Sequence, residues 1–92
     1  IKQVNEAACL VYSKTREKKP RVAFISSKKN GNSVIRNRTK RVLKEIYRLN
    51  QHKIDPNFDY IFIASRKLKY LDFNTSQKRV MQLFQNNKLY QK

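Results

Sequence analysis

Six basic residues lie in one short stretch of this sequence, which begins with a lysine pair and ends in the middle of an expected helix. Cations in the first turns of a helix are mildly unfavourable, because the helix dipole already places partial positive charge there. Free backbone amides, the dipole and converging cations together form an anion site of the phosphate type. We therefore predict phosphate binding by Lys28, Lys29, Arg36, Arg38, Lys40 and Arg41.

A solvated basic face is the plainer alternative. Only Glu45 interrupts this face, and residues 14–53 carry 14 basic against 2 acidic side chains. Such an imbalance favours phosphate binding over mere solvation, because the mutual repulsion of the cations is relieved by a polyanion.

A helix from Ser33 to about Leu49 is expected to position these cations. At 100° per residue its apolar stripe is formed by Ile35, Thr39, Val42, Ile46 and Leu49, with Val34 and Leu43 at the margins. The opposite arc carries Asn37, Lys40, Arg41, Lys44 and Arg48, and Arg36 and Arg38 flank the stripe from either side. The only glycine, Gly31, follows an asparagine and predicts a sharp turn from a strand into this helix.

The remaining segments predict an α+β fold with one domain over residues 1–92. Strands are expected at 7–12, 21–27 and 60–65, and residues 13–20 are expected to form a hairpin loop between the first two. The strand at 60–65 is apolar on both faces, which predicts a central position. Asn74 or Thr75 can cap a last helix that faces the sheet with Val80, Met81 and Phe84.

Composition narrows the class of partner. The 92 residues contain 22 lysines and arginines against 6 acids, a formal charge of +16. A polyanion is the expected partner, with nucleic acid first, an anionic membrane surface second and an acidic protein third.

The longest apolar runs are only a few residues, which excludes a membrane span. One cysteine and one histidine exclude an internal disulfide and a zinc finger and favour the cytoplasm. Because the chain begins at Ile1 and not at Met, we expect a trimmed or truncated product.

Catalytic machinery is not recognisable in the sequence. The six acids are scattered without a pair suited to holding two metals, and there is no glycine-rich phosphate loop. His52 is expected at the surface and Cys9 as a small buried residue of its strand. We expect no catalytic residue and no metal ligand in the protein.

Aromatic residues on the expected strands favour RNA over DNA. A sheet that presents aromatics beside a basic helix suits single-stranded RNA, whereas no helix-turn-helix is visible. Phe24 and Phe62 are expected in the core, while Tyr12 fits the core and the RNA surface equally well.

Residues 27–41, SKKNGNSVIRNRTKR, closely resemble the signature of the bacterial ribonuclease P protein component, S-K-K-x-G-N-A-V-x-R-N-R-x-K-R. Lys44-Glu45 fits its continuation. The resemblance covers nearly all 92 residues, including the Leu10-Val11-Tyr12 strand, the strand at 59–64 and a closing helix that ends in Leu89-Tyr90.

The resemblance implies a small two-layer sandwich with a left-handed β-α-β crossover through the R-N-R helix and a C-terminal helix. It further implies the protein subunit of an endoribonuclease in which a catalytic RNA, with Mg²⁺ held mainly by that RNA, removes the 5′ leader of precursor tRNA. No protein catalytic residue, protein-bound cofactor, membrane or protein partner is implied. The implied contacts with the catalytic RNA are Lys28, Lys29, Asn32, Arg36, Asn37, Arg38, Lys40 and Arg41. The implied leader-binding cleft is lined by Leu10, Tyr12, Lys40, Arg41, Lys44 and Tyr90.

Departures from the pattern and other classes of function complete the prediction. The family's N-terminal helix is missing from this chain, and Ile25 stands where the family often has a small polar residue. A small ribosomal or ribosome-assembly protein is the alternative, and it would bind ribosomal RNA without stimulating precursor processing. A polybasic membrane-surface module is disfavoured, because the apolar helix stripe is expected to be used by the sheet.

Overall fold

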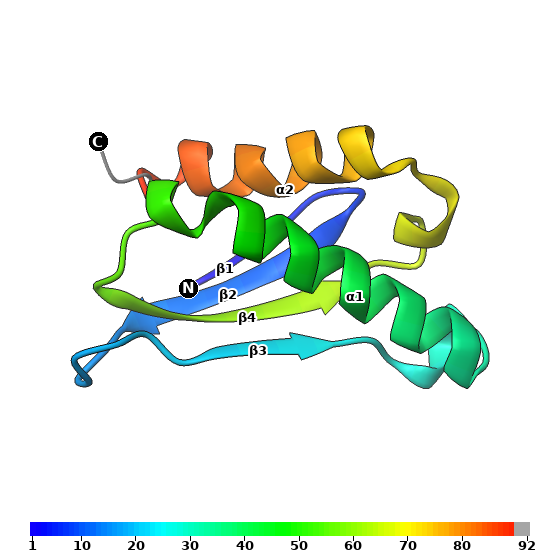
Figure 1. Cartoon of the computed structure of the whole chain (residues 1–92), viewed down its shortest axis with the longest axis horizontal. Coiled ribbons are helices and arrows are strands. Elements are labelled where there is room, and N and C mark those ends of the chain that lie inside the picture. The colour runs from blue at the N-terminus through cyan, green and yellow to red at the C-terminus, as the bar shows by residue number, and fades with distance from the viewer. Residues whose placement is uncertain (90–92) are drawn as a thin grey trace.

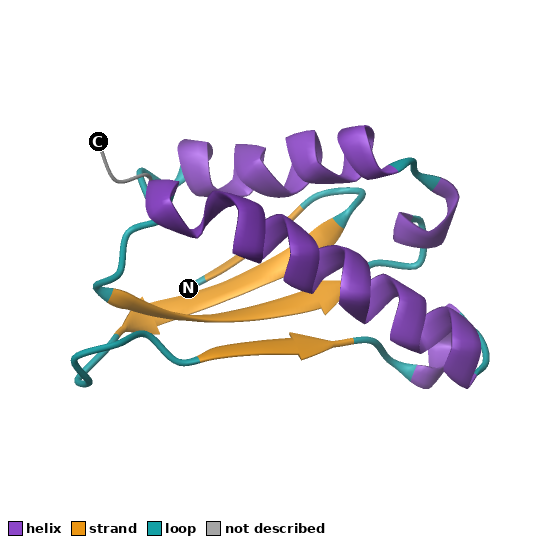
Figure 2. Cartoon of the chain, in the orientation of Figure 1, coloured by secondary structure: helices purple, strands orange, loops and turns teal. Residues whose placement is uncertain are grey.

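Within residues 1–89, four strands form one mixed sheet in the order β1-β2-β4-β3 (Figures 1 and 2). The computed structural model describes residues 1–89. The strands are β1 (Lys2–Val4), β2 (Ala8–Lys14), β3 (Val22–Ile25) and β4 (Phe58–Ala64). β1 was not expected from the sequence. It pairs with β2 through the register Gln3 to Leu10.

β4 occupies the central position that its apolar pattern predicts. It runs antiparallel to β2 and parallel to β3. The expected hairpin between β2 and β3 is therefore wrong, because β4 lies between these two strands. An apolar strand such as β4 is typical of the middle of a sheet. Since β4 pairs with β2 on one side and with β3 on the other, β2 and β3 are not neighbours.

Both long helices, α1 (Ser33–Asn50) and α2 (Phe73–Asn86), cover the same face of the sheet (Figure 1). The chain leaves β3, passes through α1 in front of the sheet and returns as the parallel strand β4 (Figure 1). This β3-α1-β4 connection is left-handed, as the resemblance implies and against the general preference for right-handed crossovers. The described part of the chain also has three single-turn 3₁₀ helices, namely η1 (Lys28–Asn30), η2 (Gln51–Lys53) and η3 (Leu68–Tyr70).

The core lies between the two helices and the sheet. Tyr60 and Phe62 of β4 are fully buried there, and Phe84 of α2 packs on both rings. Val80, Met81 and Phe84 face the sheet as predicted. The cap of α2 is Asp72 and not Asn74 or Thr75, since the Asp72 side chain accepts a 2.7 Å hydrogen bond from the Thr75 amide.

The buried stripe of α1 is rotated relative to the expected one. Thr39 and Ile46 are buried as predicted, but Leu49 and Val34 are exposed, whereas Leu43 is fully buried. Asn50 joins the buried side because its Nδ2 donates to the Ile46 carbonyl at 2.8 Å and to Gln77 Oε1 at 2.9 Å. Two hydrogen bonds satisfy this amide, so it takes the place that the pattern assigned to an apolar residue.

The other face of the sheet has no helix on it within residues 1–89 (Figure 2). Its exposed apolar side chains include Val4, Ile25 and Ile61. Cys9 lies in register with Val4 and Ile63 on this face and is half-buried, which corrects the expectation of full burial. In the described part of the chain, no helix has the length and apolar character needed to cross a membrane.

Candidate nucleic-acid interface

α1 begins where the sequence predicts, directly after the lone glycine. Gly31 has φ of 131°, and a Cβ built there would lie 2.9 Å from Cδ1 of Ile35. Both the positive φ and the close approach favour glycine at this position. The next residue, Asn32, caps the helix by accepting a 3.1 Å hydrogen bond from the Ile35 amide. Asn32 therefore has a structural role as the cap of α1, and its contact with RNA stays a prediction.

A buried polar network fixes η1, which we call the basic turn, against the sheet and the helix. Asn30 Nδ2 donates to Ser26 Oγ at 2.9 Å and to the Ala64 carbonyl at 3.1 Å. Thr39 Oγ1 of α1 lies 2.9 Å from Ser26 Oγ. Because β3 ends at Ile25, Ala64 has no partner on that strand, and Asn30 supplies the missing donor.

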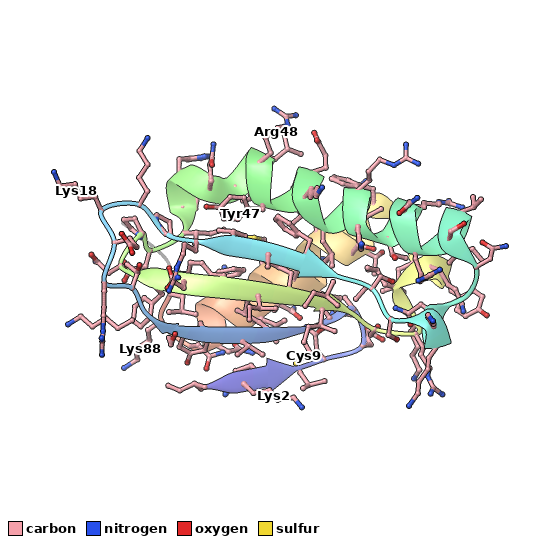
Figure 3. All side chains as sticks on the ribbon, turned by 90° about the horizontal axis from the view of Figure 1, so that it is seen from below. Lys2, Cys9, Lys18, Tyr47, Arg48 and Lys88 are labelled. Carbon is pink, nitrogen blue, oxygen red and sulfur yellow. The ribbon has the colours of Figure 1, made fainter. Side chains whose placement is uncertain are left out.

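A second hydrogen bond holds the basic turn from outside. Lys69 Nζ, on η3, donates to the Asn30 carbonyl at 2.9 Å. In Figures 1 and 3, η1 and η3 lie at the same end of the molecule, beside the first turns of α1. The cations of the basic turn and of α1 are therefore presented by one rigid corner of the fold.

The predicted phosphate contacts come together at this corner, on the basic turn and on the two flanks of α1. Lys28 and Lys29 are exposed on the basic turn. Arg36 and Arg38 flank the buried stripe of α1 on opposite sides, as predicted. Arg38 lines a hollow toward η3, while Arg36 is half-buried on the other flank.

The outer arc of α1 forms a shallow cationic depression, which we call the basic hollow. It has a volume of about 410 Å³ and is lined by Asn37, Lys40, Arg41 and Lys44. Farther along the same helix, Tyr47 points toward the sheet and Arg48 away from it (Figure 3). The ring of Tyr47 packs on Phe24 and Phe62, and burial raises the pKa of its hydroxyl.

Acidic side chains leave the corner uncompensated. Within residues 1–89 the ion pairs are Arg21 with Asp59, Arg48 with Glu45 and Arg79 with Glu6. A side-chain hydrogen bond from Arg48 lowers the pKa of Glu45, and a backbone hydrogen bond from Arg21 lowers that of Asp59. These carboxylates stay ionised with their own partners, so no ion pair among the described residues neutralises the basic turn or the basic hollow.

Arg36 shows the same excess of donors. Its Nε is buried and has no hydrogen-bond partner in the described part of the chain. A buried unsatisfied donor is costly unless a ligand supplies the acceptor. A phosphate oxygen is an acceptor of the required kind.

The predicted leader-binding cleft is wrong for two of its residues. Leu10 is 1% exposed and Tyr12 is 7% exposed, and both belong to the core under the helices. The Tyr12 hydroxyl donates to Asn87 Oδ1 at 3.1 Å, just after α2. Their strand was identified correctly, but α2 covers the face on which they lie. Lys40, Arg41 and Lys44 do share one surface, and Tyr90 lies outside the described residues.

Three features of the corner were missed from the sequence. No element was predicted between the strand at 60–65 and the last helix, yet η3 places Lys69 against the basic turn. Asn30 stands at the variable position of the signature and gave no sign of being buried. Tyr70 is an exposed aromatic, and its basic neighbours in RKLKY form a combination that is typical of RNA-binding surfaces.

The described residues contain no group of three or more histidines, cysteines, aspartates or glutamates placed to hold a metal ion. His52 is exposed on η2, as expected. The arrangement that the structure does provide is a set of cations without acidic partners, which can bind and orient phosphates.

Comparison with known proteins agrees with this chemistry. The Ribonuclease P family model matches residues 2–88. The chain is 43% identical over 72 residues to the ribonuclease P protein component of Natranaerobius thermophilus, covering 78% of this chain and 63% of that protein. It is 38% identical over 87 residues to the ribonuclease P protein component of Fusobacterium nucleatum, covering 87% of this chain and 76% of that protein.

A solved structure of the RNase P protein from Thermotoga maritima has a TM-score of 0.81 at 28% identity, covering 90% of this chain and 81% of that chain. The present chain spans less than two thirds of the length of several curated relatives that it matches. The family model nevertheless matches almost every described residue, the basic turn and α1 included, and the chain belongs to the Ribonuclease P family.

Proposed function

We propose that this chain is the protein subunit of ribonuclease P and acts in the cytoplasm by binding a catalytic RNA. The observation that carries the proposal is the corner of unpaired cations on the basic turn and α1. Each cation that contacts a phosphate releases counterions, which makes binding strong and salt-dependent. The family membership favours this function over that of a ribosomal protein.

On this proposal the chemistry belongs to the RNA. The RNA, with Mg²⁺ held mainly by the RNA itself, hydrolyses the phosphodiester that joins the 5′ leader to precursor tRNA. The protein contributes position and charge: it neutralises phosphates and holds the RNAs together, which lowers the Mg²⁺ concentration required. No protein side chain acts as nucleophile or base, and no protein partner is required.

The basic hollow is the part of this surface that we assign to the leader. Lys40, Arg41 and Lys44 face solvent together and leave room for the backbone of a single strand. Lys28, Lys29, Asn32, Arg36, Asn37 and Arg38, with Lys40 and Arg41 shared, are assigned to the catalytic RNA. Leu10 and Tyr12 have no part in the proposal, because α2 covers them.

The direct test is cleavage of a precursor tRNA by a bacterial ribonuclease P RNA at low Mg²⁺, with and without this chain. Stimulation supports the subunit role. Absence of stimulation together with loss of binding to the RNA would refute it. Binding without stimulation would contradict the leader assignment and leave the contact with the catalytic RNA intact.

Charge-matched variants separate specific contacts from net charge. Arg41→Glu, in the basic hollow, is expected to weaken RNA binding by about tenfold or more. It should also lower the slope of log affinity against log salt by about 0.7 to 0.9. Arg48→Glu changes net charge equally on the same helix, but Arg48 lies outside the basic hollow and is paired with Glu45. Equal losses in the two variants would contradict the site.

A further inference from the structure

η3 carries an exposed aromatic ring at the edge of the basic corner. Tyr70 is 79% exposed, more than the other large apolar side chains in the described residues that stand open to solvent. The backbone that carries it is held in a turn, because the Tyr70 amide donates to the Lys67 carbonyl at 3.0 Å. A large apolar ring on a rigid turn remains accessible to a partner.

Lys69 contacts both this ring and the basic turn. Lys69 Nζ lies 5.3 Å from the centroid of the Tyr70 ring and donates to the Asn30 carbonyl. A cation at this distance is attracted to the aromatic face. One ammonium thus connects the ring of η3 to the turn that carries Lys28 and Lys29.

Further cations lie on and beside η3, the turn that carries this ring, in the described part of the chain. Arg66 and Lys67 are exposed just before η3. Arg38 and Lys69 line a hollow of about 150 Å³ between α1 and η3. The one carboxylate that lines this hollow among residues 1–89, Asp72, caps α2, and the hydrogen bond from the Thr75 amide lowers its pKa.

We propose that Tyr70 stacks on an unpaired base of the RNA that α1 binds, while Arg38, Lys67 and Lys69 contact the flanking phosphates. This inference rests on the proposed function and adds a base-stacking contact to a surface otherwise built from charge. Aromatic rings beside basic side chains are the usual means of holding unpaired nucleotides. Because every base has a π-face, the contact is tolerant of sequence.

Tyr70→Trp provides a direct reporter, since the chain contains no tryptophan of its own. Titration with a bacterial ribonuclease P RNA, and separately with oligouridylate, is expected to quench the indole fluorescence of this variant at unchanged affinity. Tyr70→Ala is expected to weaken binding about 5- to 100-fold, the range for loss of one stacked base. Its salt slope should stay unchanged, because no phosphate contact is lost.

Two controls use an exposed apolar residue far from the corner. Val4 is 63% exposed on β1, the edge strand opposite β3. Val4→Ala should leave affinity unchanged, and the indole of Val4→Trp should be quenched much less than that of Tyr70→Trp. Tyr70→Leu keeps apolar area without a π-system and should resemble Tyr70→Ala.

The outcomes separate this inference from the function beneath it. If the unsubstituted chain binds the ribonuclease P RNA, and Tyr70→Ala binds as tightly while Tyr70→Trp is not quenched, the stacking contact is refuted and the proposed function stands. If the unsubstituted chain fails to bind that RNA, the proposed function falls. Quenching of the Tyr70→Trp variant by oligouridylate then decides whether a ring at this position binds unpaired bases at all.

Discussion

Asn30→Ala tests whether buried hydrogen bonds hold the basic corner in place. Asn30 is 1% exposed, and its amide group donates to Ser26 Oγ and to the Ala64 carbonyl. Alanine removes both donors while the backbone carbonyl that Lys69 contacts remains. Of the side-chain hydrogen bonds described above that tie the basic turn to the rest of the fold, only that of Lys69 would then remain.

The magnitude follows from the two groups left behind. The Ala64 carbonyl becomes an unsatisfied buried acceptor, at a cost of about 1–3 kcal/mol, and the lost bond to Ser26 adds about 1 kcal/mol. Ser26 retains Thr39, 2.9 Å away, so its cost stays at the lower value. The free energy of unfolding should fall by about 2–4 kcal/mol, which lowers the Tm of a domain of this size by roughly 10–30 °C.

Thermal and urea unfolding followed by circular dichroism measure this loss. Asn74→Ala, at an exposed position in the first turn of α2, is the matched control and should change stability by less than about 0.5 kcal/mol. Asn30→Asp keeps the size of the side chain but turns an acceptor toward the Ala64 carbonyl. Unfolding of Asn30→Asp at the same urea concentration as the unsubstituted chain would refute the role given to these hydrogen bonds.

Two further substitutions test the helix cap and the corrected position of Tyr12. Asn32→Ala removes the cap of α1 and should cost about 1 kcal/mol in urea unfolding; a cost of only a few tenths of a kcal/mol would mean that the bond to the Ile35 amide contributes little. Tyr12→Phe loses the bond to Asn87 and should cost about 1 kcal/mol while leaving discrimination between precursor and mature tRNA unchanged. A change in that discrimination would contradict the exclusion of Tyr12 from the leader-binding site.

The helix of the candidate site was predictable because its signals are local. A turn glycine, a cap and a spacing of three to four residues define α1, and the observed helix begins at the expected Ser33. The same spacing places Arg36 and Arg38 on opposite flanks. These features depend only on residues within a few positions of one another.

The prediction of the leader cleft was wrong because it depends on how the elements pack together and not on the local sequence pattern. β2 alternates between two faces, and its sequence identifies Leu10 and Tyr12 as sharing one of them. Which face α2 covers depends on the path of the chain after β4. The same dependence hid the pairing of β4 with both β2 and β3, since the turn-like residues 13–20 suggested a hairpin that the topology does not contain.

Asn30 shows how polar burial escapes sequence reasoning and why it matters here. An asparagine next to glycine is ordinarily part of an exposed turn. Here the strand β3 stops one residue before the partner of Ala64, and the side chain of Asn30 completes the hydrogen bonding that the strand leaves open. The repulsion among Lys28, Lys29 and the arginines of α1 opposes the close approach of the basic turn and the helix. Buried hydrogen bonds are short-range and are not screened away by the ions that weaken the repulsion. The corner can therefore keep its cations unpaired and close together before any RNA arrives, so that binding gains from their charge without first having to order them.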